Sequence, residues 1–270
     1  MINQGAVGVQ YPFSRRRRLE LAVGGVHEQR DGIVRSTAFV GGRAVGSAAE
    51  RLVATGTTYG TSTIALVHDD AVQGPTSPKS GSRWRIEAGQ SVGEVRFGTA
   101  LVDARRYLRL APVTLAARAL HFGRYGGDAE TRLAPIFIGD PTLVRGYRAD
   151  TFGAGECGEG AGCPALARLA GSRIAVGSLE LRLPVHEFLA RGNGIVPGLE
   201  IAPFIDAGLA WNAGDPLRLR LAEGTARGIV ASGGVSLRMN AGGVRLELTW
   251  AQPWQRERGG VFTFGLVPGW

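Results

Sequence analysis

Residues 244–250 read Val-Arg-Leu-Glu-Leu-Thr-Trp, and this strict alternation of apolar and polar side chains decides the fold class. Successive side chains of a β-strand point to opposite faces, so one face of this segment is oily and the other is polar. The same period of two residues recurs in 83–88, 173–184 and 231–238. The sequence therefore predicts an all-β protein whose strands carry one apolar and one charged face.

The alternating segments divide the chain into about twelve expected strands, several of them longer than the roughly five to six residues usual in soluble proteins. They span residues 6–13, 19–29, 49–59, 61–69, 83–93, 94–108, 113–125, 173–185, 199–211, 229–240, 244–254 and 261–267. Residues 33–47 fit either a loop or a further strand. Strands of about 9–11 residues can cross a bilayer at a tilt. Short turns that alternate with long connections are typical of outer-membrane barrels, so we expect an antiparallel transmembrane β-barrel.

The composition agrees with a barrel and argues against a helical membrane protein and a nucleic-acid-binding protein. The chain has 270 residues, 44% of them hydrophobic, and a mean hydropathy of +0.02, which suits a protein that is apolar on its outer face alone. No run approaches the ~18 apolar residues of a transmembrane helix. The net charge of +8 comes almost entirely from arginines spread along the expected strands, so we expect no nucleic-acid partner.

The long stretch 134–171 does not alternate, and it contains the motif Val144-Arg145-Gly146-Tyr147. This motif resembles the Val-Arg-Gly-Phe/Tyr signature of the BamA/TamA-type outer-membrane β-barrel family, also known as the bacterial surface antigen barrel domain. In that family the motif lies in a long extracellular loop that folds back into the barrel lumen. Two later segments, Gly-Ser-Leu-Glu-Leu-Arg-Leu-Pro at 177–184 and Pro-Phe-Ile-Asp-Ala-Gly at 203–208, resemble family strands that follow this loop.

The resemblance carries expectations about the whole chain. Residues 1–270 would form one outer-membrane barrel domain, with 134–171 as a long extracellular loop folded into the lumen. About twelve strands would be present of a family barrel of about 16, without the N-terminal strands and the periplasmic repeats. The expected location is the bacterial outer membrane. Expected partners are outer-membrane lipid, the barrel assembly machinery and unfolded outer-membrane or exported proteins.

Two carboxylates are candidate partners for Arg145. Alternation places Glu180 and Asp206 on the polar faces of their strands, which point into the barrel if the oily faces meet lipid. A partly buried arginine needs a carboxylate, and its planar guanidinium can bond one through two nitrogens. We therefore expect Arg145 to hold the loop in the lumen through Asp206 or Glu180. The alternative is a solvated Arg145 that pins nothing.

The only two cysteines, Cys157 and Cys163, lie in the same glycine-rich part of this loop. In an exported protein such a pair is typically a disulfide, although free thiols remain an alternative. A metal site would need two more ligands, and the loop contains no histidine. The aromatic Trp270 at the end of the chain resembles the C-terminal signal of outer-membrane barrels.

The sequence shows no catalytic motif, so we expect neither an enzyme nor a cofactor or metal. The leading hypothesis is a BamA/TamA-type barrel that takes part in the insertion or translocation of outer-membrane proteins, or that anchors and exports an attached domain. A passive pore that prefers anions is one alternative, because arginines would line the lumen. A soluble β-sandwich domain is another.

Overall fold

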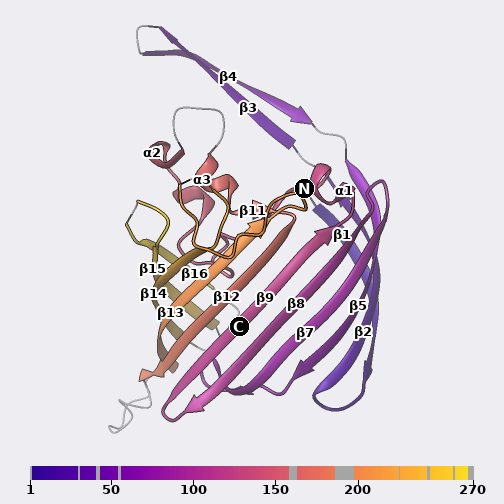
Figure 1. Ribbon diagram of the computed structural model, residues 1–270, viewed down its shortest axis with the longest axis vertical. Coiled ribbons are helices and arrows are strands. Elements are labelled where there is room, and N and C mark those ends of the chain that lie inside the picture. The colour runs from indigo at the N-terminus through magenta and orange to yellow at the C-terminus, as the bar shows by residue number, and fades with distance from the viewer. Residues whose placement is uncertain are drawn as a thin grey trace.

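The computed structural model describes all residues except 1, 30, 41–42, 54–55, 158–162, 186–197, 225, 242–243, 258 and 267–270. One large antiparallel sheet of twelve strands dominates it and curves around an interior (Figure 1). Eleven strands follow one another in the order β1 (Ile2–Pro12), β2 (Arg17–Glu28), β5 (Thr57–Asp69), β7 (Pro78–Gly93), β8 (Phe97–Leu110), β9 (Val113–Tyr125), β12 (Arg173–Pro184), β13 (Gly198–Trp211), β14 (Val230–Ala241), β15 (Val244–Pro253) and β16 (Val261–Leu266). The short β6 (Val72–Gln73) pairs with β7.

The predicted fold class is confirmed: the chain is an all-β protein of the antiparallel transmembrane-barrel type, with a long connection folded inside. The soluble β-sandwich alternative is wrong, because one continuous curved sheet replaces the two packed sheets that a sandwich requires. Within the described part of the chain, no helix is long and apolar enough to span a membrane.

One predicted strand is placed differently. Residues 49–59 do not form one strand: 49–53 belong to a separate hairpin, and 57–59 begin a strand of the large sheet. Strands β3 (Asp31–Val40) and β4 (Arg43–Val53) pair only with each other, in a long hairpin between β2 and β5 (Figure 1). Strand β5 begins at Thr57 and pairs directly with β2. Alternation alone could not separate these cases, because a projecting hairpin and a barrel strand share the period of two.

Alternation sets the two faces of the sheet. On β15, Leu248 and Trp250 are exposed on the outside, whereas Thr249 and Ala251 are buried on the inside. Across the register, Leu248 aligns with Leu237 of β14 and Phe264 of β16, so the outer rows are apolar. Further exposed apolar side chains on the outer face are Ile64, Ile86, Val102, Leu179, Leu181, Ile201, Ile205 and Val235. A sheet that is apolar outside and polar within matches a lipid exterior.

The connection between β9 and β12 covers the interior at one end of the sheet. It contains three short helices, α1 (Asp128–Thr131), α2 (Ala154–Cys157) and α3 (Pro164–Ala167), a 3-10 turn at Ala149–Thr151, and the strand pair β10 (Ile136–Phe137) and β11 (Ala170–Gly171). Its residues Ile138, Val144, Tyr147 and Leu169 are buried and pack against Leu120, Ile174, Val176 and Val230 of the sheet. This cluster is the main hydrophobic core, so the loop is part of the folded interior.

Candidate functional site

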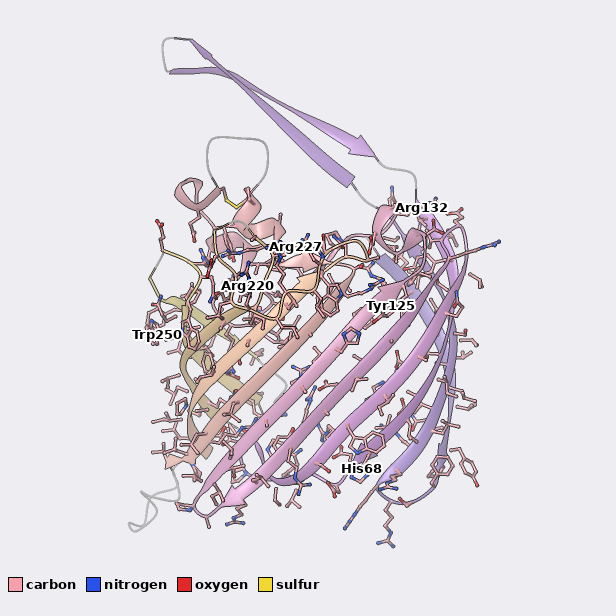
Figure 2. The ribbon with its side chains drawn as sticks, viewed as in Figure 1. His68, Tyr125, Arg132, Arg220, Arg227 and Trp250 are labelled. Atoms are coloured by element: carbon pink, nitrogen blue, oxygen red, sulfur yellow. A yellow bond between two sulfur atoms is a disulfide. The ribbon has the colours of Figure 1, made fainter. Side chains whose placement is uncertain are left out.

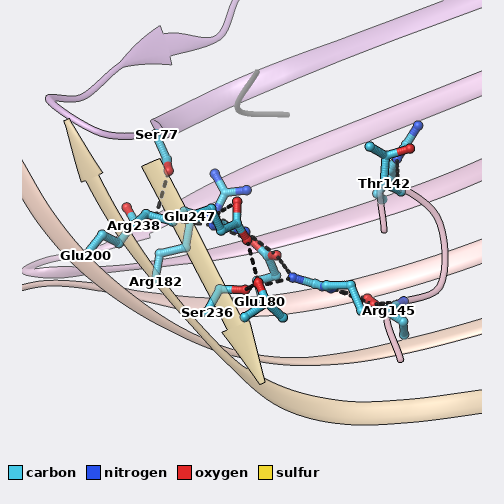
Figure 3. Close-up of polar contacts among 12 residues, drawn as sticks. Ser77, Thr142, Arg145, Glu180, Arg182, Glu200, Ser236, Arg238 and Glu247 are labelled. Atoms are coloured by element: carbon cyan, nitrogen blue, oxygen red, sulfur yellow. Dashed lines mark hydrogen bonds and ion pairs between the residues drawn. The ribbon is translucent and has the colours of Figure 1, made fainter. Parts of the chain in front are cut away.

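Arg145 lies at the centre of the interior, and two strands supply its partners. Its Nε and Nη2 atoms donate to the two carboxylate oxygens of Asp206 on β13, each at 2.7 Å. Its Nη1 donates to Glu180 on β12 at 2.8 Å (Figure 3). The backbone N–H of Arg145 also donates to Asp206, at 3.2 Å. The guanidinium also lies over the Phe204 ring, 3.4 Å from its centroid, so a cation–π contact adds to these hydrogen bonds.

Glu180 joins this pair to a wider ionic cluster. Its carboxylate accepts from Arg145, from both terminal nitrogens of Arg238 at 2.8 and 2.9 Å, and from Nε of Arg182 at 3.0 Å. Arg238 in turn contacts Glu200 at 3.3 Å and Glu247 at 3.0 Å. Three arginines thus face four carboxylates on the inner side of β12 to β15 (Figure 3). Buried charges are tolerated only with such complete pairing.

The residues that flank Arg145 fix the backbone of the motif. Gly146 has a φ of +90°, and an added side chain would meet Ala251 and Pro253 of β15 at 3.3 and 3.4 Å. Only glycine adopts this conformation at low cost. The Tyr147 hydroxyl lies 2.8 Å from the carbonyl oxygen of Ala231 and 2.7 Å from Oε1 of Gln255, and its one hydrogen is shared between these two acceptors. The motif is therefore held on both sides of Arg145 by the sheet.

A second arginine, Arg256, bonds several residues of the long loop between Gly146 and Glu156. It comes from the connection between β15 and β16 and is 8% exposed. Its guanidinium contacts both carboxylate oxygens of Glu156 at 2.7 Å and the carbonyl oxygen of Gly146 at 3.1 Å. It also bonds Thr151 and stacks on the Phe152 ring at 3.8 Å. Sequence reasoning missed this residue, because nothing in residues 254–260 distinguishes it from a solvated turn arginine.

The opposite end of the interior is crossed by the connection between β5 and β7. Residues 74–77 of this segment, which we name the strap, have Thr76 and Ser77 almost fully buried. The Ser77 hydroxyl donates to Glu200 at 2.7 Å (Figure 3). The Asn240 side chain donates to the carbonyl of Pro75 at 2.7 Å. The strap therefore spans from one side of the sheet to β13 and β14 on the other. It meets the same ionic cluster that holds the loop.

The structure brings several predicted residues together. Arg145 contacts both Glu180 and Asp206, where the sequence left the choice between them open. Cys157 and Cys163 are joined in a disulfide. Trp270 lies outside the described residues. In the part of the chain that the structure describes, no group of three or more His, Cys, Asp or Glu side chains is placed to hold a metal ion.

Three comparisons with known proteins bear on this arrangement. A family model described as the Omp85 superfamily domain matches residues 5–266. BamA from Haemophilus ducreyi, solved without POTRA domains 1-3, superposes with a TM-score of 0.65 at 15% identity, over 97% of this chain and 53% of that one. CdiB from Acinetobacter baumannii superposes with a TM-score of 0.57 at 12% identity, over 97% and 41%. The chain thus spans about half the length of these structures. No curated protein matches it in sequence.

Proposed function

Because this chain belongs to the Omp85 superfamily, we propose that it acts in a bacterial outer membrane as a barrel for the insertion or translocation of proteins, or for the export of an attached domain. The observation that carries the proposal is the loop held inside the sheet by Arg145, with Val144 and Tyr147 fully buried beside it. A loop fixed at this depth occupies the space that a solute would need. Client proteins would then contact the strands of the sheet and would not pass through its interior.

The charges of the lumen argue against the alternative of a passive anion-preferring pore. On the inner face of the sheet, Arg85 pairs with Glu20 and Glu87, and Asp103 pairs with Arg105 and Arg118. Arginines neutralised in this way leave little net positive field for an anion. The loop at one end and the strap at the other further obstruct the path.

Strand β16 supplies the element for contact with a client chain. It pairs with β15 on one side, and its other edge has no strand partner among the described residues. The outward side chains of Phe262, Phe264 and Leu266 are strongly exposed. An unpaired edge presents free N–H and C=O groups, which an incoming strand can extend by β-augmentation. We propose that a client strand with alternating apolar residues pairs here while its oily face enters lipid.

Reconstitution into lipid vesicles tests this proposal. The chain is incorporated into proteoliposomes, an unfolded small outer-membrane barrel is added, and client folding is followed by its altered gel migration without heating. Client folding faster than in protein-free vesicles supports the proposal. Steady anion-selective conductance in planar bilayers, without any acceleration of client folding, contradicts it and favours the pore.

A further inference from the structure

Two adjoining hollows mark the apolar outer face of the sheet. The larger, of about 390 Å³, lies over β9, β12 and β13, and the smaller, of about 290 Å³, lies over β7, β8 and β9. The two share Ala119. The outer row through the larger of the two carries small side chains, Ala119, Ala175, Gly177 and Ala207. A separate hollow of about 690 Å³ lies over β1, β2, β5 and β7. Together the two adjoining hollows form a trough that faces the space where lipid chains would lie.

The connection between β13 and β14 roofs the larger hollow. Its residues Leu219 and Ile229 line the hollow above the sheet. The segment from 217 to 221 reads Leu-Arg-Leu-Arg-Leu, and all five of its side chains are exposed, with Leu219 at 75%. Three exposed leucines on a connection outside the sheet are costly in water. They are favourable where this segment rests on a lipid surface.

The two arginines of this segment are free to bind an anion. Among the residues that the structure describes, neither Arg218 nor Arg220 has a hydrogen bond or ion pair from its guanidinium group, and both are exposed. Asp215, an acidic residue of the same connection, is already engaged by Arg227 at 3.2 Å. Figure 2 places Arg220 and Arg227 at the end of the sheet that carries the long loop. Arginine is the side chain best suited to phosphate.

Aromatic side chains place the roof at the depth of lipid headgroups. His121, which lines the larger hollow, stacks on Trp211 at 5.7 Å and contacts the Tyr125 hydroxyl at 2.7 Å. Tyr125 is also covered by Arg173 at 4.6 Å. Belts of tryptophan and tyrosine mark the boundary between hydrocarbon and headgroups in membrane barrels. The apolar trough therefore lies on the hydrocarbon side of this boundary, and the charges of Arg218 and Arg220 lie at the boundary itself.

We propose that this face binds one molecule of a phosphorylated glycolipid of the lipid A type, with an acyl chain in the trough and its phosphates on Arg218 and Arg220. Two exposed guanidinium groups only two residues apart in the sequence favour a headgroup that carries more than one negative charge. The site rests on the proposed membrane location of the chain, but it does not depend on insertion activity.

Native mass spectrometry of the folded chain in detergent tests the site, with lipid A and phosphatidylglycerol as separate probes. The unaltered chain retains lipid A, and the double substitution Arg218→Gln/Arg220→Gln lowers that retention at least about tenfold, because two charge-assisted contacts are lost. The matched control is Arg15→Gln/Arg16→Gln. It removes the same charge from the exposed turn at the opposite end of the sheet and leaves retention unchanged.

A second variant tests the trough itself. Gly177→Leu fills the larger hollow, since no atom lies within 4 Å of an added Cβ there, and it lowers lipid A retention. Gly25→Leu, an equally open position on β2 away from both hollows, does not. Unheated gel migration verifies that each variant is folded.

Three results overturn the proposal: equal retention by the Arg218/Arg220 variant, equal loss in the Arg15/Arg16 control, or phosphatidylglycerol held as tightly as lipid A. A chain that retains lipid A but does not accelerate client folding contradicts the proposed function alone. A chain that accelerates client folding but retains no lipid A contradicts this site alone.

Discussion

Replacing Arg145 by alanine removes the group on which the buried loop depends. The substitution deletes the three side-chain bonds of 2.7–2.8 Å to Asp206 and Glu180. Glu180 keeps Arg182 and Arg238, so its charge remains compensated. Asp206 is 0% exposed, and Arg145 is the arginine that pairs with it. The damage therefore concentrates on one carboxylate that loses its counter-charge.

The expected cost follows from that asymmetry. Removing one partner of a buried ion pair costs about 3–5 kcal/mol, because the remaining charge stays buried without compensation. The apparent melting temperature should then fall by on the order of 10 °C. Adding Asp206→Asn to Arg145→Ala removes the stranded charge and should recover part of the loss. A simple loss of packing would not be relieved in this way.

The assay is the temperature at which the folded chain in detergent loses its compact gel migration, together with the rate of protease cleavage within residues 134–171. Arg148→Ala is the matched control. Arg148 lies three residues further along the same loop, and among the residues that the structure describes its guanidinium pairs only with exposed Asp150, so its removal should change neither reading. An Arg145→Ala chain that melts and is cleaved like the unaltered chain would refute the reasoning.

Three further predictions concern the loop and its surroundings. Arg256→Ala should destabilise the end of the loop by about 2 kcal/mol, because its charged hydrogen bonds are lost, and hydrogen exchange should rise in residues 148–157 but not at Arg145. The unreduced protein should show no free thiol, because Cys157 and Cys163 are bonded; two reactive thiols would contradict this. The Ser172 hydroxyl and the N–H of Ala213 donate to Glu130 and hold the pKa of its carboxyl below the usual value. The stability that ionised Glu130 adds to the fold is therefore fully present above the ordinary carboxyl pKa, and it is lost as the pH falls through the lowered pKa. Glu130→Gln should flatten that acid-side dependence in a melting series, and an unchanged profile would contradict it.

The parts of the fold that depend on side-chain alternation could be predicted from the sequence. The period of two in residues 244–250 specifies a strand and its two faces, and β15 has both. The same parity placed Glu180 and Asp206 on inner faces. The prediction of one barrel strand over 49–59 was wrong, because 49–53 pair in the separate β3–β4 hairpin and 57–59 begin β5. Partner choice depends on contacts distant in sequence, which a local period does not record.

Contacts in the site between residues that lie far apart in sequence could not be predicted. Arg182 lies two residues from Glu180 on β12, where alternation alone places both on the inner face, but only the register between β12, β13 and β14 brings Arg238 to Glu180. Arg256 and Ser77 lie in connections without periodicity, and each bonds a partner at least 100 residues away in sequence, Glu156 at a separation of 100 and Glu200 at 123. Such contacts require the curvature of the sheet, which no short segment encodes.

A designed disulfide tests most directly whether the loop lies inside the sheet. A Cβ added at Gly208 would lie 2.6 Å from a methyl carbon of Val144, a position that the sulfur of a cysteine at 144 can take, so two cysteines here are close enough to bond. With Cys157 and Cys163 replaced by serine, Val144→Cys/Gly208→Cys should cross-link on mild oxidation. Val144→Cys/Gly177→Cys, whose second position faces outward on the neighbouring strand, should not. A cross-link to Gly177→Cys, or none to Gly208→Cys, would contradict a loop held in the lumen.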